Sequence, residues 1–110
     1  MKYNIHITNA AVADLNSAVD YIEHILLNPQ AADDLLLETE KMIMDLAVFP
    51  EKHSLVTDPV LNAWGIRLTT VMDYLVFYIV SEEEKSIYIV RFLRTRQNWN
   101  ASLGHGFSLE

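Results

Sequence analysis

The first part of the chain alternates apolar and polar residues and then changes to a helical period. Apolar side chains occupy every second position over residues 3–8, the two-residue period of a β-strand. Thr8 or Asn9 can then cap a helix. The Asn28-Pro29 pair interrupts this helix, and Pro29 can instead open the next one at its first turn. The predicted apolar stripe of the first helix consists of Ala11, Leu15, Ala18, Val19, Ile22 and Leu26.

A second helix is predicted from about residue 30 to residue 48, and Phe49-Pro50 ends it. The break between the two helices is short, which indicates an αα-hairpin. Residues 51–63 are expected to form an irregular connection. The predicted apolar stripe of the second helix consists of Ala32, Leu35, Leu36, Thr39, Ile43 and Leu46.

The pattern after this connection is that of strands. Residues 66–70, 74–80 and 86–93 are rich in β-branched and aromatic side chains, with a turn near Met72-Asp73 and a polar loop at 81–85. The predicted fold class is α+β, in the order β-α-α-β-β-β. A helical hairpin would pack on one face of a mainly antiparallel four-stranded sheet. The place of the first strand within the sheet stays open.

Length and composition favour one soluble domain. Hydrophobic residues make up 51% of the 110 residues and charged residues 21%, which argues against disorder. We expect a single domain over residues 1–100 and a tail over 101–110, whose last two residues look like a tag remnant. The start lacks a signal-peptide pattern and the apolar stretches are strand-sized, so we expect a cytoplasmic protein without a membrane span.

Charge is distributed unevenly along the chain. The net charge of −7 argues against indiscriminate binding to nucleic acid. Acidic residues dominate the first half, whereas every arginine lies at or beyond position 67. A cationic site, if the protein has one, therefore lies in the second half.

The densest polar constellation is the segment 91–99, with Arg91, Arg94, Arg96 and Trp99. Guanidinium groups can bind phosphate through two hydrogen bonds, and an indole can stack on a base, so the segment can form an anion-binding patch. The alternative is a charged strand edge whose arginines pair with the acidic helices. Arg67 can belong to the same patch or be a solvated strand residue.

Other candidate chemistry is weak in this sequence. The histidines at 6, 24, 53 and 105 lack metal-ligand spacing, and there is no cysteine. The helical acids, Asp14 among them, fit solvated faces. No glycine-rich phosphate loop or nucleophile elbow is present. We therefore expect neither a metal nor another cofactor.

The order of motifs resembles the RelE/ParE superfamily of toxins. The resemblance spans residues 3–99, and each motif is weak without the others. The segments that carry it are Ala13-Asp14-Leu15 with Tyr21-Ile22, then Leu46-Ala47-Val48-Phe49-Pro50, Gly65-Ile66-Arg67, Asp73-Tyr74-Leu75-Val76-Phe77-Tyr78, Ile87-Tyr88-Ile89-Val90-Arg91-Phe92-Leu93, Arg96 and Trp99.

This resemblance implies the growth-inhibiting toxin of a type II toxin–antitoxin (plasmid stabilisation) system. A cognate antitoxin would wrap the toxin and cover its basic groove, in a homodimer or a heterotetramer with the antitoxin. Partner contacts would involve Arg67, Tyr74 and the segment 91–99. In RelE-like members the toxin cuts mRNA on the ribosome without a metal, and Arg67 and Arg96 would then be catalytic.

Several positions depart from the RelE-like pattern. Leu75 follows Tyr74 where those ribonucleases commonly carry arginine, Gly65 replaces a lysine, and Gln97 replaces a basic residue. No tyrosine follows Trp99. These departures favour the ParE-like branch, whose members poison DNA gyrase through protein contacts. A third interpretation is a non-toxic member that binds its antitoxin and acts as a corepressor.

Overall fold

The computed structural model describes residues 2–51, 53–57 and 59–94. The elements follow the predicted order β-α-α-β-β-β, with two short helical additions. Their bounds are β1 (Asn4–Ile7), α1 (Asn9–Asp20), the π-helix η1 (Tyr21–Ile25), α2 (Pro29–Val48), α3 (Pro59–Ala63), β2 (Arg67–Val71), β3 (Tyr74–Ser81) and β4 (Ser86–Arg94).

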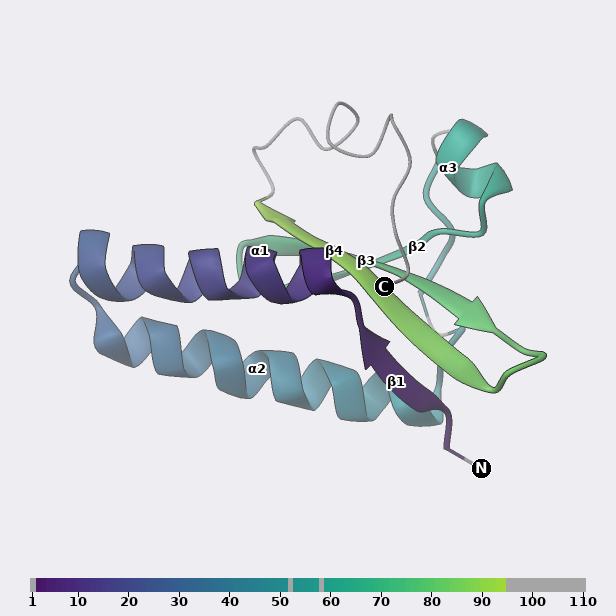
Figure 1. The fold of residues 1–110 in the computed structure, drawn as a ribbon, viewed down its shortest axis with the longest axis horizontal. Coiled ribbons are helices and arrows are strands. Elements are labelled where there is room, and N and C mark those ends of the chain that lie inside the picture. Colours follow the sequence, from purple (N-terminus) through teal and green to yellow (C-terminus); the bar gives the residue numbers. More distant parts are fainter. Residues whose placement is uncertain (1, 52, 58, 95–110) are drawn as a thin grey trace.

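The four strands form one sheet in the order β1-β4-β3-β2. β2, β3 and β4 are joined as an antiparallel meander, and β1 lies at the edge, parallel to β4. The predicted fold class is therefore confirmed, and the position of the first strand is now assigned. Figure 1 shows α1 and α2 side by side as an antiparallel pair.

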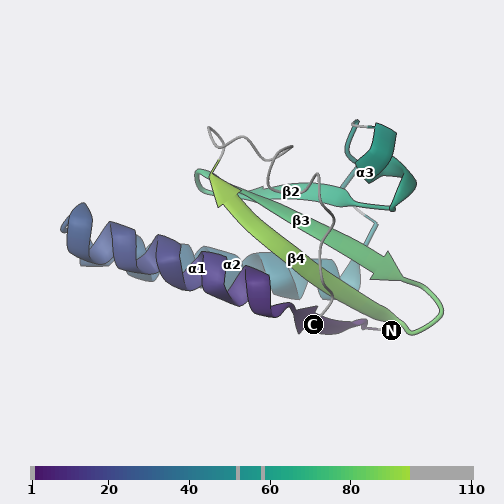
Figure 2. The same cartoon turned by 45° about the horizontal axis from the view of Figure 1, so that its top comes forward.

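The sheet carries a hydrophobic cluster on each face. On the face toward the helical hairpin, residues such as Ala11, Leu35 and Leu46 pack against Val76, Tyr78 and the inward residues of β4. On the opposite face, Val56 and Leu61 cover Phe77, Val90 and Leu93. In Figure 2 the helical hairpin and α3 lie on different sides of the strands. Because both faces are covered, β3 is apolar at every position but Ser81, and β4 is apolar from Ile87 to Leu93 except at Arg91.

Side-chain caps begin both long helices where the sequence predicts. The Thr8 hydroxyl accepts a hydrogen bond from the Ala11 N–H (3.2 Å) and donates to the Ile89 carbonyl (3.0 Å), which ties the start of α1 to β4. The Asn28 side chain accepts from the Ala31 N–H, and Pro29 occupies the first turn of α2.

Three details of the predicted helices were wrong. Residues 21–25 form a π-helix, in which each residue turns through a smaller angle, so Leu26 leaves the buried stripe and is exposed. Leu36 is also exposed, because a helix lying on one sheet face buries only a narrow stripe. The connection 51–63 is not wholly irregular, since Pro59 begins the short helix α3.

None of the helices in the described part of the chain combines the length and apolar character that crossing a membrane requires.

Candidate partner-binding site at the end of β4

An ion pair joins α1 to β4 where β1 has already ended. Arg91 donates from Nε and Nη2 to the two carboxylate oxygens of Asp14, at 2.6 and 2.9 Å. The backbone N–H of Phe92 donates to the same carboxylate (3.0 Å). The last paired residue of β1 is Ile7, opposite Ile89, so Asp14 occupies the edge that the strand leaves open.

Asp14 was predicted to lie on a solvated helix face, and the structure contradicts this. The side chains of Asp14 and Arg91 are only 16% and 24% exposed. The hydrogen bond that Arg91 donates to the Asp14 carboxylate raises the pKa of Arg91 above its ordinary value. Two donated bonds and a third from the main chain offset the cost of moving the charges out of water. Arg91 thus has a clear structural role in this fold.

A shallow cleft lies beside this ion pair. Arg94, the last residue of β4, lies over the ring of Tyr21 in the π-helix, with 5.3 Å from its guanidinium carbon to the ring centre. Tyr74 is paired with Arg94 across the strands and is buried. Burial raises the pKa of Tyr74, while the charge of Arg94 acts in the opposite direction. The cleft has a volume of about 260 Å³, and Ser17, Ala18 and Phe92 are among its other lining residues.

This cleft therefore brings together three of the residues proposed from sequence, namely Tyr74, Arg94 and, through Asp14, Arg91. It offers a cation, two phenols and an apolar floor. Such a surface suits a protein side chain with an apolar body and a negative or hydrogen-bonding end.

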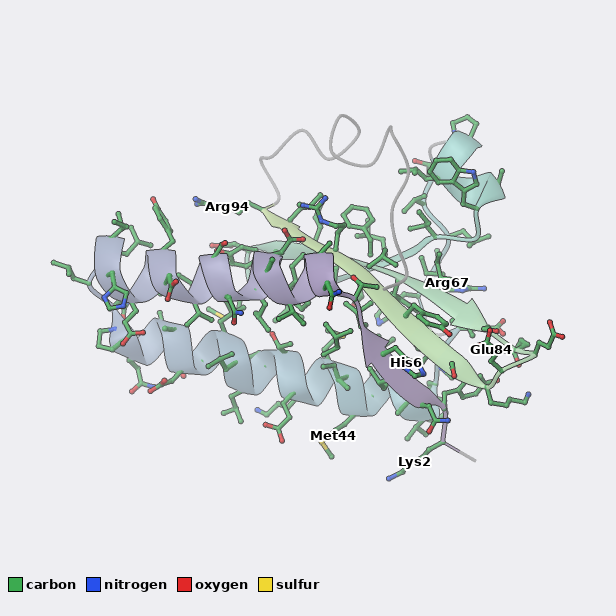
Figure 3. The ribbon with its side chains drawn as sticks, in the orientation of Figure 1. Lys2, His6, Met44, Arg67, Glu84 and Arg94 are labelled. Atoms are coloured by element: carbon green, nitrogen blue, oxygen red, sulfur yellow. The ribbon has the colours of Figure 1, made fainter. Side chains whose placement is uncertain are left out.

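Arg67 lies elsewhere. It is paired with Tyr78 on β3, whereas Arg94 is paired with Tyr74, so the two arginines are separated by roughly 13 Å along the strand direction. Figure 3 shows the labelled Arg67 and Arg94 well apart, with Arg94 at the end of β4. The structure does not join them into one basic patch.

The Arg67 guanidinium holds the loop before α3. Its Nη1 donates to the His53 carbonyl at 2.7 Å, and Nη2 is 3.6 Å from a carboxylate oxygen of Glu51. The His53 ring nitrogen Nε2 shares a hydrogen bond of 3.1 Å with the Thr69 hydroxyl. These contacts leave the Arg67 side chain only 20% exposed.

The side chain of Tyr78 is completely buried next to this loop. Its ring meets the His53 ring edge to face, with 6.5 Å between centroids. Its hydroxyl makes no hydrogen bond of good geometry with the described residues. Burial raises the pKa of the phenol, while the nearby main chain of His53 acts in the opposite direction. A buried hydroxyl of this kind carries an energetic cost.

Sequence reasoning missed Asp14, Tyr21 and His53. For the first two a weak signal existed, because Asp14, Ala18 and Tyr21 follow steps of four and three and so share one helix face. His53 had no such signal. Arg96 and Trp99, the remaining proposed residues, lie outside the described residues. Within the described ranges no cluster of side chains suits a metal ion.

Comparison with known proteins gives a consistent result. The family described as ParE toxin of the type II toxin–antitoxin system parDE matches residues 5–99. A solved structure of the chromosomal ParDE system from P. aeruginosa is 21% identical, covers 84% of this chain and 96% of its own, and has a TM-score of 0.66.

A second solved structure, the toxin–antitoxin complex RelBE2 from Mycobacterium tuberculosis, is 17% identical. It covers 86% of this chain and 99% of its own, with a TM-score of 0.60. At these identities the likeness establishes the fold. No curated protein matches the sequence.

Proposed function

This chain belongs to the family of ParE toxins of type II toxin–antitoxin systems, and we propose that it poisons DNA gyrase through protein contacts until a cognate antitoxin neutralises it. RelE-like relatives share this fold, so the fold does not distinguish a gyrase poison from a ribonuclease. Two features of the structure and one of the sequence favour the gyrase poison over the RelE-like ribonuclease.

The observation that carries the proposal is the separation of Arg67 from Arg94, together with the engagement of Arg67 and Arg91 by other groups of the protein. Metal-free RNA cleavage needs a base for the 2′-OH, a cation for the developing phosphorane charge and an acid for the leaving 5′-oxygen, all within reach of one phosphate. Arg67 is instead bound to the His53 carbonyl, and Arg91 to Asp14. Within the described ranges these cations do not converge.

A second feature is Leu75, which follows Tyr74 on β3. It is partly buried and packs with the cluster on the face opposite the helical hairpin. An arginine at this position would be the additional cation that RelE-like ribonucleases commonly use. Its replacement by leucine removes a phosphate ligand and adds apolar packing.

The third feature is the net charge of −7, which opposes entry into an RNA-rich site.

We further propose that the antitoxin covers the cleft of Tyr21, Tyr74 and Arg94, with contacts to Arg67, Arg91, Arg96 and Trp99. An apolar helix face laid into this groove would bury the exposed ring of Tyr21 and cover the charge of Arg94.

The test is to induce the untagged protein without its antitoxin and to map RNA 5′ ends across the transcriptome, with Arg96→Ala as the control strain. We expect growth arrest and a DNA-damage response without new 5′ ends. Purified protein should also stabilise gyrase-dependent DNA breaks in vitro.

New 5′ ends inside translated codons, absent from the Arg96→Ala strain, would instead establish a ribosome-dependent ribonuclease. If the cells keep growing and their RNA stays intact, the protein is instead a non-toxic member that binds its antitoxin and acts as a corepressor. In either case an Arg94→Glu variant should lose antitoxin binding, whereas Met72→Glu, an exposed change outside the cleft, should retain it.

A further inference from the structure

The outer face of α2 carries an apolar stripe that points away from the sheet. Leu37, Met44 and Val48 are 51%, 63% and 45% exposed, and Phe49 just beyond the helix is 62% exposed. Steps of seven and four place the three helical residues on one face. In Figure 3 the side chain of Met44 projects from α2 away from the rest of the molecule.

Carboxylates flank this stripe on both sides. At about 100° per residue, Asp33 and Glu40 fall on one side of it, and Asp34 and Asp45 on the other. The helix has one lysine, Lys41, whose ammonium lies 3.2 Å from the carboxylate of Glu38. The outer face of α2 is therefore apolar along its middle and acidic along the margin of Asp33 and Glu40. The other margin is net acidic, with Lys41 beside Asp34 and Asp45.

The stripe leads into a hollow at the end of α2. Its volume is about 660 Å³, and its lining residues are Tyr3, Asp45, Val48, Phe49, Pro50 and Glu51. The floor is aromatic and aliphatic, while Asp45 and Glu51 contribute carboxylates. Val48 belongs to both the stripe and the hollow, so the two form one continuous surface, which we name the α2 face.

We propose that the α2 face binds a basic amphipathic helix of a partner protein. The apolar stripe of that helix would cover Leu37, Met44 and Val48, with one large apolar side chain in the hollow. Its lysines and arginines would lie along the two acidic margins. This pairing follows the a/d seam and flanking charges of a coiled coil.

The negative charge of the α2 face favours a basic partner over the other molecules that could cover it. A second copy of this chain would bring acidic margins against acidic margins, and nucleic acid or an anionic membrane would be repelled in the same way. The α2 face is also distinct from the cleft at Arg94, which presents a cation. The inference does not depend on toxic activity.

The experiment uses the full chain, labelled with ¹⁵N, and two synthetic helical peptides of about 18 residues, long enough to cover the stripe. The peptides share one leucine stripe and differ only in their flanks, which are lysine and arginine in the first and glutamate in the second. We expect the basic peptide to bind at least about tenfold more tightly. It should shift the amide signals of α2 and residues 48–51, and added salt should weaken it.

Variants locate the contact. Met44→Glu should abolish binding of the basic peptide, whereas Ile25→Glu, at an equally exposed position at the far end of the helical hairpin, should leave it unchanged. The double change Asp33→Lys with Glu40→Lys should reduce the preference for the basic peptide. Equal affinity for both peptides, shifts outside the α2 face, or dimerisation through α2 without peptide would each overturn the proposal.

Discussion

At the end of β4, Arg91 lies under α1 and donates two hydrogen bonds to Asp14, whereas Arg67, at the start of β2, donates to a main-chain carbonyl of the preceding loop. The first arginine faces a full negative charge fixed on a helix. The second faces a dipole on an irregular segment, with the Glu51 carboxylate 3.6 Å away. Residues of one type in one sheet thus have different structural roles, and their contributions to stability should differ accordingly.

The largest effect should follow from Asp14→Ala. This change leaves the Arg91 charge mostly buried without its partner and removes the acceptor for the Phe92 N–H, so we expect a loss of about 3 kcal/mol in unfolding free energy. Urea unfolding followed by circular dichroism measures it. Asp20→Ala, an exposed acid on the same helix, is the control and should change stability by less than about 0.5 kcal/mol.

A double-mutant cycle with Arg91→Ala sharpens this prediction. The two single changes should be strongly non-additive, because either one breaks the same pair. Additive losses would mean that Asp14 and Arg91 contribute independently and that the ion pair between them adds little.

Arg67→Met should have a smaller effect. It keeps the apolar stem of the side chain and removes the hydrogen bond to the His53 carbonyl, which should cost about 1.5 kcal/mol. Hydrogen exchange of residues 53–57 should accelerate, while the amides of α1 keep their protection. A loss as large as that of Asp14→Ala would contradict the difference between the two regions.

The smallest effect, and of opposite sign, should come from Tyr78→Phe. The hydroxyl is buried without a hydrogen bond to the described residues, so its removal should stabilise the protein by up to about 1 kcal/mol. Thermal unfolding measures the change. Destabilisation would show that the hydroxyl has a partner in solution.

The same variant has a pH signature. Burial raises the folded-state pKa of Tyr78 above the unfolded value of about 10. The contribution of Tyr78 to stability should therefore be constant below about pH 10 and decline as the pH rises toward the folded-state pKa. The stability of the Tyr78→Phe variant should decline less steeply with pH. In the wild-type protein the unfolded chain releases this proton more readily than the folded one, and the variant lacks the proton altogether.

The sequence predicted most of the fold because local patterns determine it. Thr8 and Pro29 mark helix starts through their own side chains, and the apolar character of residues 74–80 reflects burial on both faces. Leu26 could not be predicted, since the change to a π-helix at Tyr21 depends on packing against the rest of the molecule.

The candidate site was predicted only in part. A hairpin sequence indicates that β3 pairs with β4, but a register shift between Phe77 and Tyr78 is what places Arg94 opposite Tyr74. The regular hairpin register would have placed Leu93 there. Asp14 is 77 residues away from Arg91, and no local pattern connects them. Their contact depends on the edge position of β1, which ends at Ile7 and leaves β4 open to α1.

By itself, then, the sequence determined the order of elements, the buried faces of the strands and the uneven distribution of charge. These follow from side-chain periodicity and composition, which act over a few residues. Only the tertiary structure decided which arginines are held by the fold, that Arg67 and Arg94 lie apart, and that α2 presents an acid-bordered apolar face. Those properties depend on contacts between segments that are distant in the chain, and the periodicity of side chains over a few residues does not predict such contacts.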